Sequence, residues 1–227
     1  MSFNKFMSEL NGSRVEGELV KTILFSLCTS FLLVGVIYLV KLALIPDFMS
    51  RYGFFLFLAI LSYASILPAI RQVRAYKTLP CMSGMMVGMT IGMVAGFLAG
   101  FYIGATNGMF WGSVFGMGVG IFFGAWLGSC CGIMGFMEGV MAGFMGGIMG
   151  AMTAVMLLND NLKAASIIVF VVCEVILIGL SYMIYRETQE AQREVQEDYF
   201  FAIVASFILT LLTLYVMVFG PRSFLFQ

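Results

Sequence analysis

Glycine recurs at every fourth position over a long central stretch of the chain, and this repeat constrains the fold more than any other feature. The step of four is unbroken from Gly84 to Gly132, which spans 49 residues. One helix of that length measures about 73 Å, whereas the hydrocarbon core of a bilayer is roughly 30 Å thick. The stretch must therefore fold back on itself. We expect breaks at Ala105–Thr106–Asn107 and near Ser129–Cys130–Cys131, where polar or small residues interrupt it.

The spacing also indicates how the resulting helices pack. Helices in lipid gain little by hiding apolar side chains, so small residues four apart, which let two backbones approach closely, favour association. We expect three consecutive glycine-zipper helices over residues 84–104, 108–128 and 132–157. The glycines expected at their contacts are Gly84, Gly88, Gly92, Gly96, Gly100, Gly112, Gly116, Gly120, Gly124, Gly139, Gly143 and Gly147.

Composition supports a membrane location. The chain is 61% hydrophobic and 11% charged, with a mean hydropathy of +1.02, whereas soluble domains contain about 25% charged residues. The apolar runs are about twenty residues long, as transmembrane helices require. Four further spans are expected over 19–45, 52–70, 164–185 and 199–219. These observations predict an all-α integral membrane protein of about seven spans, a single membrane domain over 1–227, in which four helices wrap the glycine-rich three.

The connecting segments predict an orientation. Residues 1–18 form either a frayed tail or a short interfacial helix, Pro46–Asp47 a turn, 71–80 a basic linker, and 186–198 a charged helical linker. With seven spans, eight Lys and Arg residues lie on the side of the N-terminus and four on the other. Cytoplasmic loops carry the excess of positive charge. We therefore expect a multi-pass protein of the cell membrane with a cytoplasmic N-terminus.

Several classes of function are disfavoured by what the sequence lacks. Twelve basic residues balance twelve acidic ones, so no basic surface for nucleic acid is indicated. The chain has no His, which removes the usual axial ligand of haem. The GxxxG matches follow no strand and precede no Lys, so they are packing signals and not nucleotide cradles. We expect neither an enzyme nor a haem or nucleotide cofactor.

Methionine is unusually frequent, with nineteen residues, and is arranged in a stripe. In the span 132–157 the Met residues recur every three or four positions and fall within about 120° of the helix circumference. The glycines occupy the opposite arc, and Glu138 lies inside the Met arc. The Met residues of this span are Met134, Met137, Met141, Met145, Met149, Met152 and Met156.

Cysteines add to this sulfur-rich region. Cys81 opens the third expected span, while Cys130 and Cys131 separate the fourth from the fifth, so all three are expected at the cytoplasmic end. Thiolate and thioether ligands favour Cu(I). The expected metal ligands are Cys81, Met82, Cys130, Cys131, Met134, Met137, Met141 and Met145. The alternative is that Met, an adaptable packing residue, only fills gaps beside glycine.

Two carboxylates, Glu138 and Glu174, lie within expected spans. A charge at the bilayer centre costs at least about 2.5 kcal/mol, so such residues usually face a partner, a cavity or an ion path. No Lys, Arg or His lies at comparable depth. We expect both to face protein or water, either as a proton or cation site or as protonated side chains bonded to each other or to a backbone carbonyl.

The segment Gly132–Leu157, GIMGFMEGVMAGFMGGIMGAMTAVML, resembles a recurring segment of uncharacterised bacterial membrane proteins rich in Met and Gly. The resemblance covers residues 80–158. Some of those proteins are associated with copper or other soft metals, which implies soft-metal handling but assigns no residues.

Three hypotheses follow. The first is a protein that binds or transports a soft metal such as Cu(I), with the cysteines as its cytoplasmic mouth, the Met face as its path and Glu138 as a charge partner. The second is a non-catalytic structural or accessory subunit, in which the glycine helices dock a homo-oligomer or a larger membrane complex. The third is a proton or cation channel centred on Glu138 and Glu174.

Overall fold

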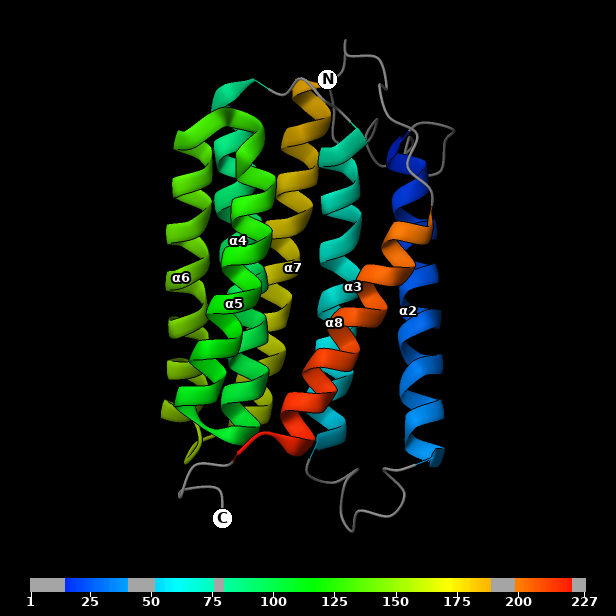
Figure 1. Cartoon of the computed structure of the whole chain (residues 1–227), viewed down its shortest axis with the longest axis vertical. Helices are drawn as coiled ribbons and strands as arrows, with labels where there is room; N and C mark the ends of the chain where they lie inside the picture. Colours follow the sequence, from blue (N-terminus) through cyan, green and yellow to red (C-terminus); the bar gives the residue numbers. More distant parts are fainter. Residues whose placement is uncertain (1–14, 41–51, 76–79, 189–198, 222–227) are drawn as a thin grey trace.

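Every regular element that the structure describes is a helix. The computed structural model describes residues 15–40, 52–75, 80–188 and 199–221. Figure 1 shows the helices standing side by side along the long axis of the molecule. Their bounds are α2 Val15–Val40, α3 Phe54–Ala75, α4 Cys81–Asn107, α5 Met109–Gly128, the 3-10 turn η3 Ser129–Cys131, α6 Gly132–Met156, α7 Leu162–Glu187 and α8 Tyr199–Phe219.

The helices have the length and polarity of membrane spans. Five helical stretches among the described residues are long and apolar enough to cross a bilayer. One of them, Met109–Met156, contains both α5 and α6, which the turn η3 separates. The apolar part of α8, Ile203–Phe219, is a shorter helix of the same character. The all-helical fold expected of the sequence is confirmed, and its apolar helices are those of a membrane protein.

Both reversals in the glycine-rich stretch occur at glycines with a positive φ. Gly108 has φ 106° and Gly132 has φ 75°, a region that glycine enters without the cost other residues incur. The first break lies beyond the expected Ala105–Asn107, because α4 keeps its helical geometry to Asn107. The second is the turn η3, at the expected position.

The helix α3 is longer than predicted. It continues to Ala75, so Arg71 and Arg74 lie in its last turns and not in a linker. Arg71 is buried and donates a hydrogen bond of 2.8 Å to the Thr22 hydroxyl of α2. The guanidinium of Arg74 lies 5.0 Å from the ring centre of Trp126. These contacts to neighbouring helices explain why the basic residues stay helical.

Some expectations concern residues that lie outside those described. These are the tail or interfacial helix up to residue 14, the turn at Pro46–Asp47, the linker residues 76–79, and the charged linker from 189 to 198. Residues 15–18, expected in the N-terminal tail, instead begin α2.

Glycine backbones meet along α4, α5 and α6 in a constant register. A methyl group at Gly88 of α4 would lie 2.7 Å from the Cα atom of Gly128 in α5. At Gly120 of α5 it would lie 2.7 Å from the carbonyl oxygen of Gly143 in α6, and at Gly96 of α4 it would lie 2.9 Å from that same oxygen. Side chains at these positions would displace backbone, so glycine is what permits the three helices to approach so closely.

The glycine-rich helices form one side of the molecule and not its centre. In Figure 1, α6, α5 and α4 occupy the left, α2 lies on the right, and α3 stands between α4 and α2, with α8 crossing over it in this view. The helix α3 packs against α2, α4, α7 and α8, whereas α6 packs against α4, α5 and η3. The expectation that four helices wrap the other three is therefore wrong. Of these three helices, α4 packs against α3, α7 and α8 and has Leu98 and Tyr102 fully enclosed, while α5 contributes Val119, Phe123 and Leu127 to the same core.

A pair of substitutions two residues apart tests this packing. Gly120→Ala should destabilise the protein by about 1–3 kcal/mol, the usual cost of overpacking, because its methyl group would meet Gly143 and Gly92. A methyl group at Gly118 would have no neighbouring atom within 4 Å. Gly118→Ala should therefore be neutral or slightly stabilising, since Ala is the better helix former. Thermal unfolding in detergent measures both. Equal effects of the two substitutions would show that the glycine contacts are not close.

Candidate functional site

The turn η3 brings two cysteine thiols together at one end of the glycine-rich helices. The Sγ atoms of Cys130 and Cys131 are 3.7 Å apart, and the Cys130 thiol donates to the Leu127 carbonyl at 3.0 Å. Both thiols lie against Gly84 of α4, where a methyl group would be 3.3 Å from Cys130 Sγ. Gly84 is three residues after Cys81, the first residue of α4. The chain thus brings all three cysteine positions to the same end, as predicted, although the Cys81 side chain is outside those described.

Two exposed thioethers lie at this end as well. Met82 is 82% exposed near the start of α4, and Met134 is 67% exposed near the start of α6. We call Cys81, Met82, Cys130, Cys131 and Met134 the sulfur cluster. Among the described residues, no three His, Cys, Asp or Glu side chains are arranged to hold a metal ion. A metal bound here would therefore need thioether sulfur or Cys81 besides the two thiols.

The Met arc of α6 lies on the outside of the molecule. Its seven Met side chains are between 40% and 69% exposed. They share the outer face with Phe136 and Phe144, while the glycines of α6 face α4 and α5. Met137, Met141 and Met145 consequently run away from the sulfur cluster along this outer surface. They line no path inside the described part of a single chain.

A second polar site lies inside the helices, around Glu174 of α7. Its Oε1 atom is buried and has no hydrogen-bond partner. The side chain of Ser65, on α3, interacts with the same carboxyl group. The Ser65 hydroxyl donates its own hydrogen to the Leu61 carbonyl at 2.8 Å.

Ser62 and Tyr102 extend this polar site between α3 and α4. Their hydroxyl oxygens are 2.7 Å apart, and because Ser62 donates to the Leu58 carbonyl, Tyr102 is the donor to Ser62. Tyr102 also lies close enough to Glu174 to interact with it electrostatically. We call Ser62, Ser65, Tyr102 and Glu174 the carboxyl cluster. Of these four residues, only Glu174 was expected from the sequence. The missed signal was the pair of serines three residues apart on one face of an otherwise apolar span.

Glu138 is separate from this cluster. It is half-buried on α6, and α6 packs against α4 and α5, while Glu174 belongs to α7, which packs mainly against α3. The alternative in which the two carboxyl groups bond to each other is therefore not realised in the described structure.

Comparisons with protein-family models, with curated proteins and with solved structures find no match to this chain.

The contact between Ser62 and Tyr102 is testable by a double-mutant cycle. Ser62→Ala and Tyr102→Phe should couple by about 0.6 kcal/mol, with roughly 1.7 kcal/mol as the upper range for hydrogen bonds between membrane helices. Unfolding of the single and double variants in mixed micelles measures the coupling. Ser62→Ala combined with Tyr215→Phe, which changes an exposed tyrosine on α8, should be additive. Additivity in both pairs would contradict the hydrogen bond.

Proposed function

We propose that this protein binds a soft metal ion, Cu(I) above all, at the sulfur cluster. The observation that carries the proposal is the 3.7 Å separation of the Cys130 and Cys131 sulfurs. Two metal–sulfur bonds of about 2.3 Å span that distance at an angle of about 107°, which leaves space for further ligands. Thioether ligands such as Met82 and Met134 favour Cu(I) over harder ions. Some of the uncharacterised Met- and Gly-rich membrane proteins that residues 80–158 resemble are associated with soft metals, which points the same way.

The proposal includes seven membrane crossings, with α4, α5 and α6 as a glycine zipper. The 20 residues of α5 and the 25 of α6 measure about 30 Å and about 37 Å, so each is long enough to span the hydrocarbon core. The sulfur cluster shares its end of the molecule with the described basic residues Lys21, Arg71, Arg74 and Arg186, whereas Lys163 begins α7 at the other end. This asymmetry supports a cytoplasmic position for the sulfur cluster in the cell membrane.

Binding is better supported than transit through one chain. The Met face of α6 is exposed, so a sulfur-lined route along it would require a second helix facing it. The same exposure supports the alternative of an accessory subunit whose α6 docks another copy or a larger complex. Both readings share the fold, and they differ in whether the thiols bind metal.

Removing the two thiols should abolish metal binding. The double variant Cys130→Ser/Cys131→Ser should lose more than about 100-fold in Cu(I) affinity, since the loss of groups that only support ligands costs 10–100-fold. Competition with a chromophoric Cu(I) chelator measures the affinity of the purified protein.

A matched control uses the other two described cysteines. Cys28→Ser/Cys173→Ser removes one exposed and one buried thiol, both far along the chain from η3, and should retain the affinity. Undiminished binding by the Cys130/Cys131 variant would refute the site, and the accessory-subunit alternative would then be favoured.

A second candidate function is a proton or cation site at the carboxyl cluster. It is favoured by the buried Glu174 Oε1 atom, which has no hydrogen-bond partner. An unsatisfied buried polar atom costs about 1–3 kcal/mol, and intramembrane carboxyl groups are usually functional. A proton or a small cation exchanging at this oxygen would remove that cost.

Flux measurements distinguish this second candidate. In vesicles containing the purified protein, Glu174→Gln should reduce proton or monovalent cation flux to background, because the amide keeps the size but cannot change charge. Glu138→Gln, on the other side of the glycine-rich helices, should retain the flux if the path runs through the carboxyl cluster. Wild-type behaviour of both variants would count against every ion path considered for this chain.

A further inference from the structure

The thiols of Cys130 and Cys131 are close enough to react with each other. Their sulfurs are 3.7 Å apart, and neither residue belongs to a disulfide. The sulfurs of a disulfide are about 2.04 Å apart, so an approach of about 1.7 Å would join these two. Rotation about the Cα–Cβ bonds of two adjacent residues can supply that movement. The pair is therefore a dithiol that can be oxidised as well as a candidate metal-binding pair.

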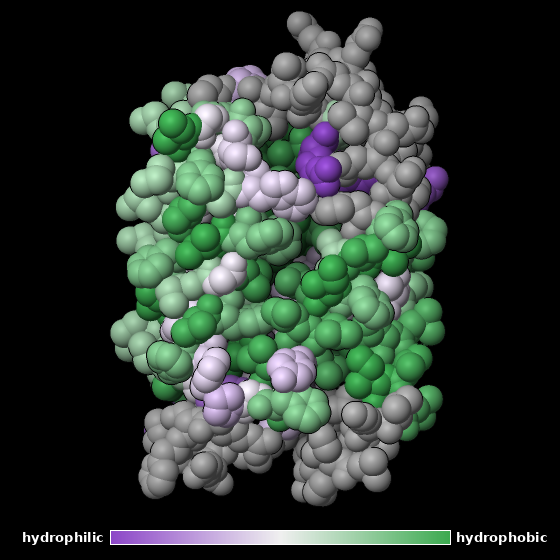
Figure 2. Space-filling model, viewed as in Figure 1, coloured by the Kyte–Doolittle hydropathy of each residue, from purple (hydrophilic) through white to green (hydrophobic). Residues whose placement is uncertain are grey.

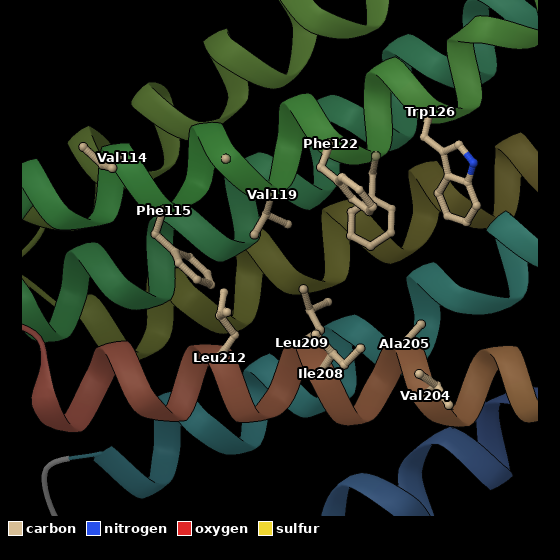
Figure 3. A pocket seen from close by; sticks show the side chains of 12 residues that line it. Val114, Phe115, Val119, Phe122, Trp126, Val204, Ala205, Ile208, Leu209 and Leu212 are labelled. Atoms are coloured by element: carbon tan, nitrogen blue, oxygen red, sulfur yellow. The ribbon is translucent and has the colours of Figure 1, made fainter.

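The helices on both sides of η3 hold the two thiols in place. A methyl group at Gly128, the last residue of α5, would collide with the backbone of Gly135 in α6. Figure 3 shows Phe122 and Trp126 of α5 extending in another direction, into the groove toward α8. Gly84 of α4 lies against both thiols. Because the ends of α5 and α6 are fixed by these contacts, the turn cannot open and separate the sulfurs.

The first of the two thiols is accessible to a water-soluble oxidant. Cys130 is exposed, whereas Cys131 is half-buried. Figure 2 shows hydrophilic surface near the upper end of the molecule, which is the end where α5 terminates in Figure 1. Cysteines that sense oxidants are solvent-accessible and often lie beside a second, resolving cysteine. Cys130 thus has the position of the reacting thiol, and Cys131 has that of the resolving thiol.

A disulfide between adjacent residues is easily reduced. Consecutive Cα atoms are 3.8 Å apart across a trans peptide, whereas the Cα atoms of ordinary disulfides are 4.4–6.8 Å apart. A bond outside that range is strained and more reducible, and strained or exposed disulfides are the labile, regulatory ones. A disulfide at this turn would therefore form under oxidation and be reversed by a small thiol.

We propose that Cys130 and Cys131 form a reversible disulfide in the presence of peroxide, and that this bond switches off the sulfur cluster. A metal is bound by thiolate sulfur, and the disulfide leaves no thiolate at η3. The loss of metal binding rests on the proposed function, because it requires that the thiols bind Cu(I). The formation of the disulfide depends only on the two thiols.

The reaction takes place in two steps. Hydrogen peroxide transfers one oxygen to the Cys130 sulfur, which becomes a sulfenic acid, and one water is released. The Cys131 sulfur then forms the S–S bond and breaks the S–O bond, and the hydroxyl leaves as a second water with the thiol hydrogen. The two thiols lose two electrons, and the peroxide gains them.

Fragment masses test the disulfide. The reduced protein is treated with one equivalent of hydrogen peroxide, alkylated, and cleaved at methionine. Residues 118–134 form one fragment with both thiols, and residues 50–82 form another with Cys81. The 118–134 fragment should become lighter by two hydrogens and resist alkylation. Treatment with glutathione before alkylation should restore both thiols.

Three variants identify the reacting residues. Cys131→Ser should stop at a sulfenic acid, one oxygen heavier, because the resolving thiol is missing. Cys81→Ser should still form the disulfide. Cys28→Ser/Cys173→Ser, which changes cysteines far along the chain from η3, should react as the wild-type protein does.

Cu(I) affinity tests the switch. The oxidised protein should lose more than about 100-fold in affinity, as expected of the Cys130→Ser/Cys131→Ser variant, and should recover after reduction. Equal affinities of the oxidised and reduced forms would overturn the switch. If the reduced protein binds no Cu(I), the proposed function fails and the switch fails with it, whereas the fragment masses still decide on the disulfide.

Other products would overturn the disulfide itself. A 118–134 fragment joined to 50–82 would show that Cys81 is the partner, and one joined to a second 118–134 fragment would show a bond between two chains. Oxidation of the wild-type protein to a sulfinic acid would show that the second thiol does not resolve the first. If Cys131→Ser fails to fold, the fragments of the wild-type protein still distinguish these products.

Discussion

Contact between helix backbones, made possible by glycine, is the interaction on which the rest of this structure depends. In lipid, apolar side chains offer little reason for helices to associate, so close packing must supply it. The helices α4, α5 and α6 meet at glycine after glycine, with Gly96, Gly120 and Gly143 close to one another near the middle. Because glycine fills the contact, the Met and Phe side chains of α6 point outward, whereas α5 keeps Val119, Phe123 and Leu127 buried beside its glycines.

The position of sulfur in the molecule follows from this arrangement. The Met residues of α6 share a helix with contact glycines and are therefore placed on the outer face, away from any interior route. The turn between α5 and α6 must be tight, since both helices start and end in contact. That turn places the thiols of Cys130 and Cys131 close together and in contact with Gly84. Close packing thus gathers thiols at one end while it spreads thioethers along the surface.

The remaining helices use a different principle. The helix α3 is mostly buried and contacts four other helices, and it contributes Ser62, Ser65 and Arg71 to polar contacts with α4, α7 and α2. Hydrogen bonds thus join α3 to its neighbours, whereas glycine contacts join α4, α5 and α6. On the side of α5 that faces α8, neither glycine contacts nor hydrogen bonds join the described parts of the helices, and an open groove lies between them. The molecule therefore combines a glycine-packed side, a polar-bonded side and an apolar groove between them.

The sequence by itself determined the elements. The bounds of the helices were predicted to within a few residues from the unbroken glycine step, the apolar runs and the positions of Pro and polar residues. The same features predicted the two reversals of the glycine-rich stretch, near Gly108 and Gly132. Periodicity also separated the Met arc from the glycine arc of α6, because side-chain direction on a helix is a local property. Tertiary structure decided what each face meets. Contacts between residues far apart in the chain decide whether the Met arc faces an interior or the outside. They also decide that Glu174 lies near Ser65 of α3. No local pattern encodes such contacts, because a membrane helix shows the same apolar surface to lipid and to a neighbouring helix.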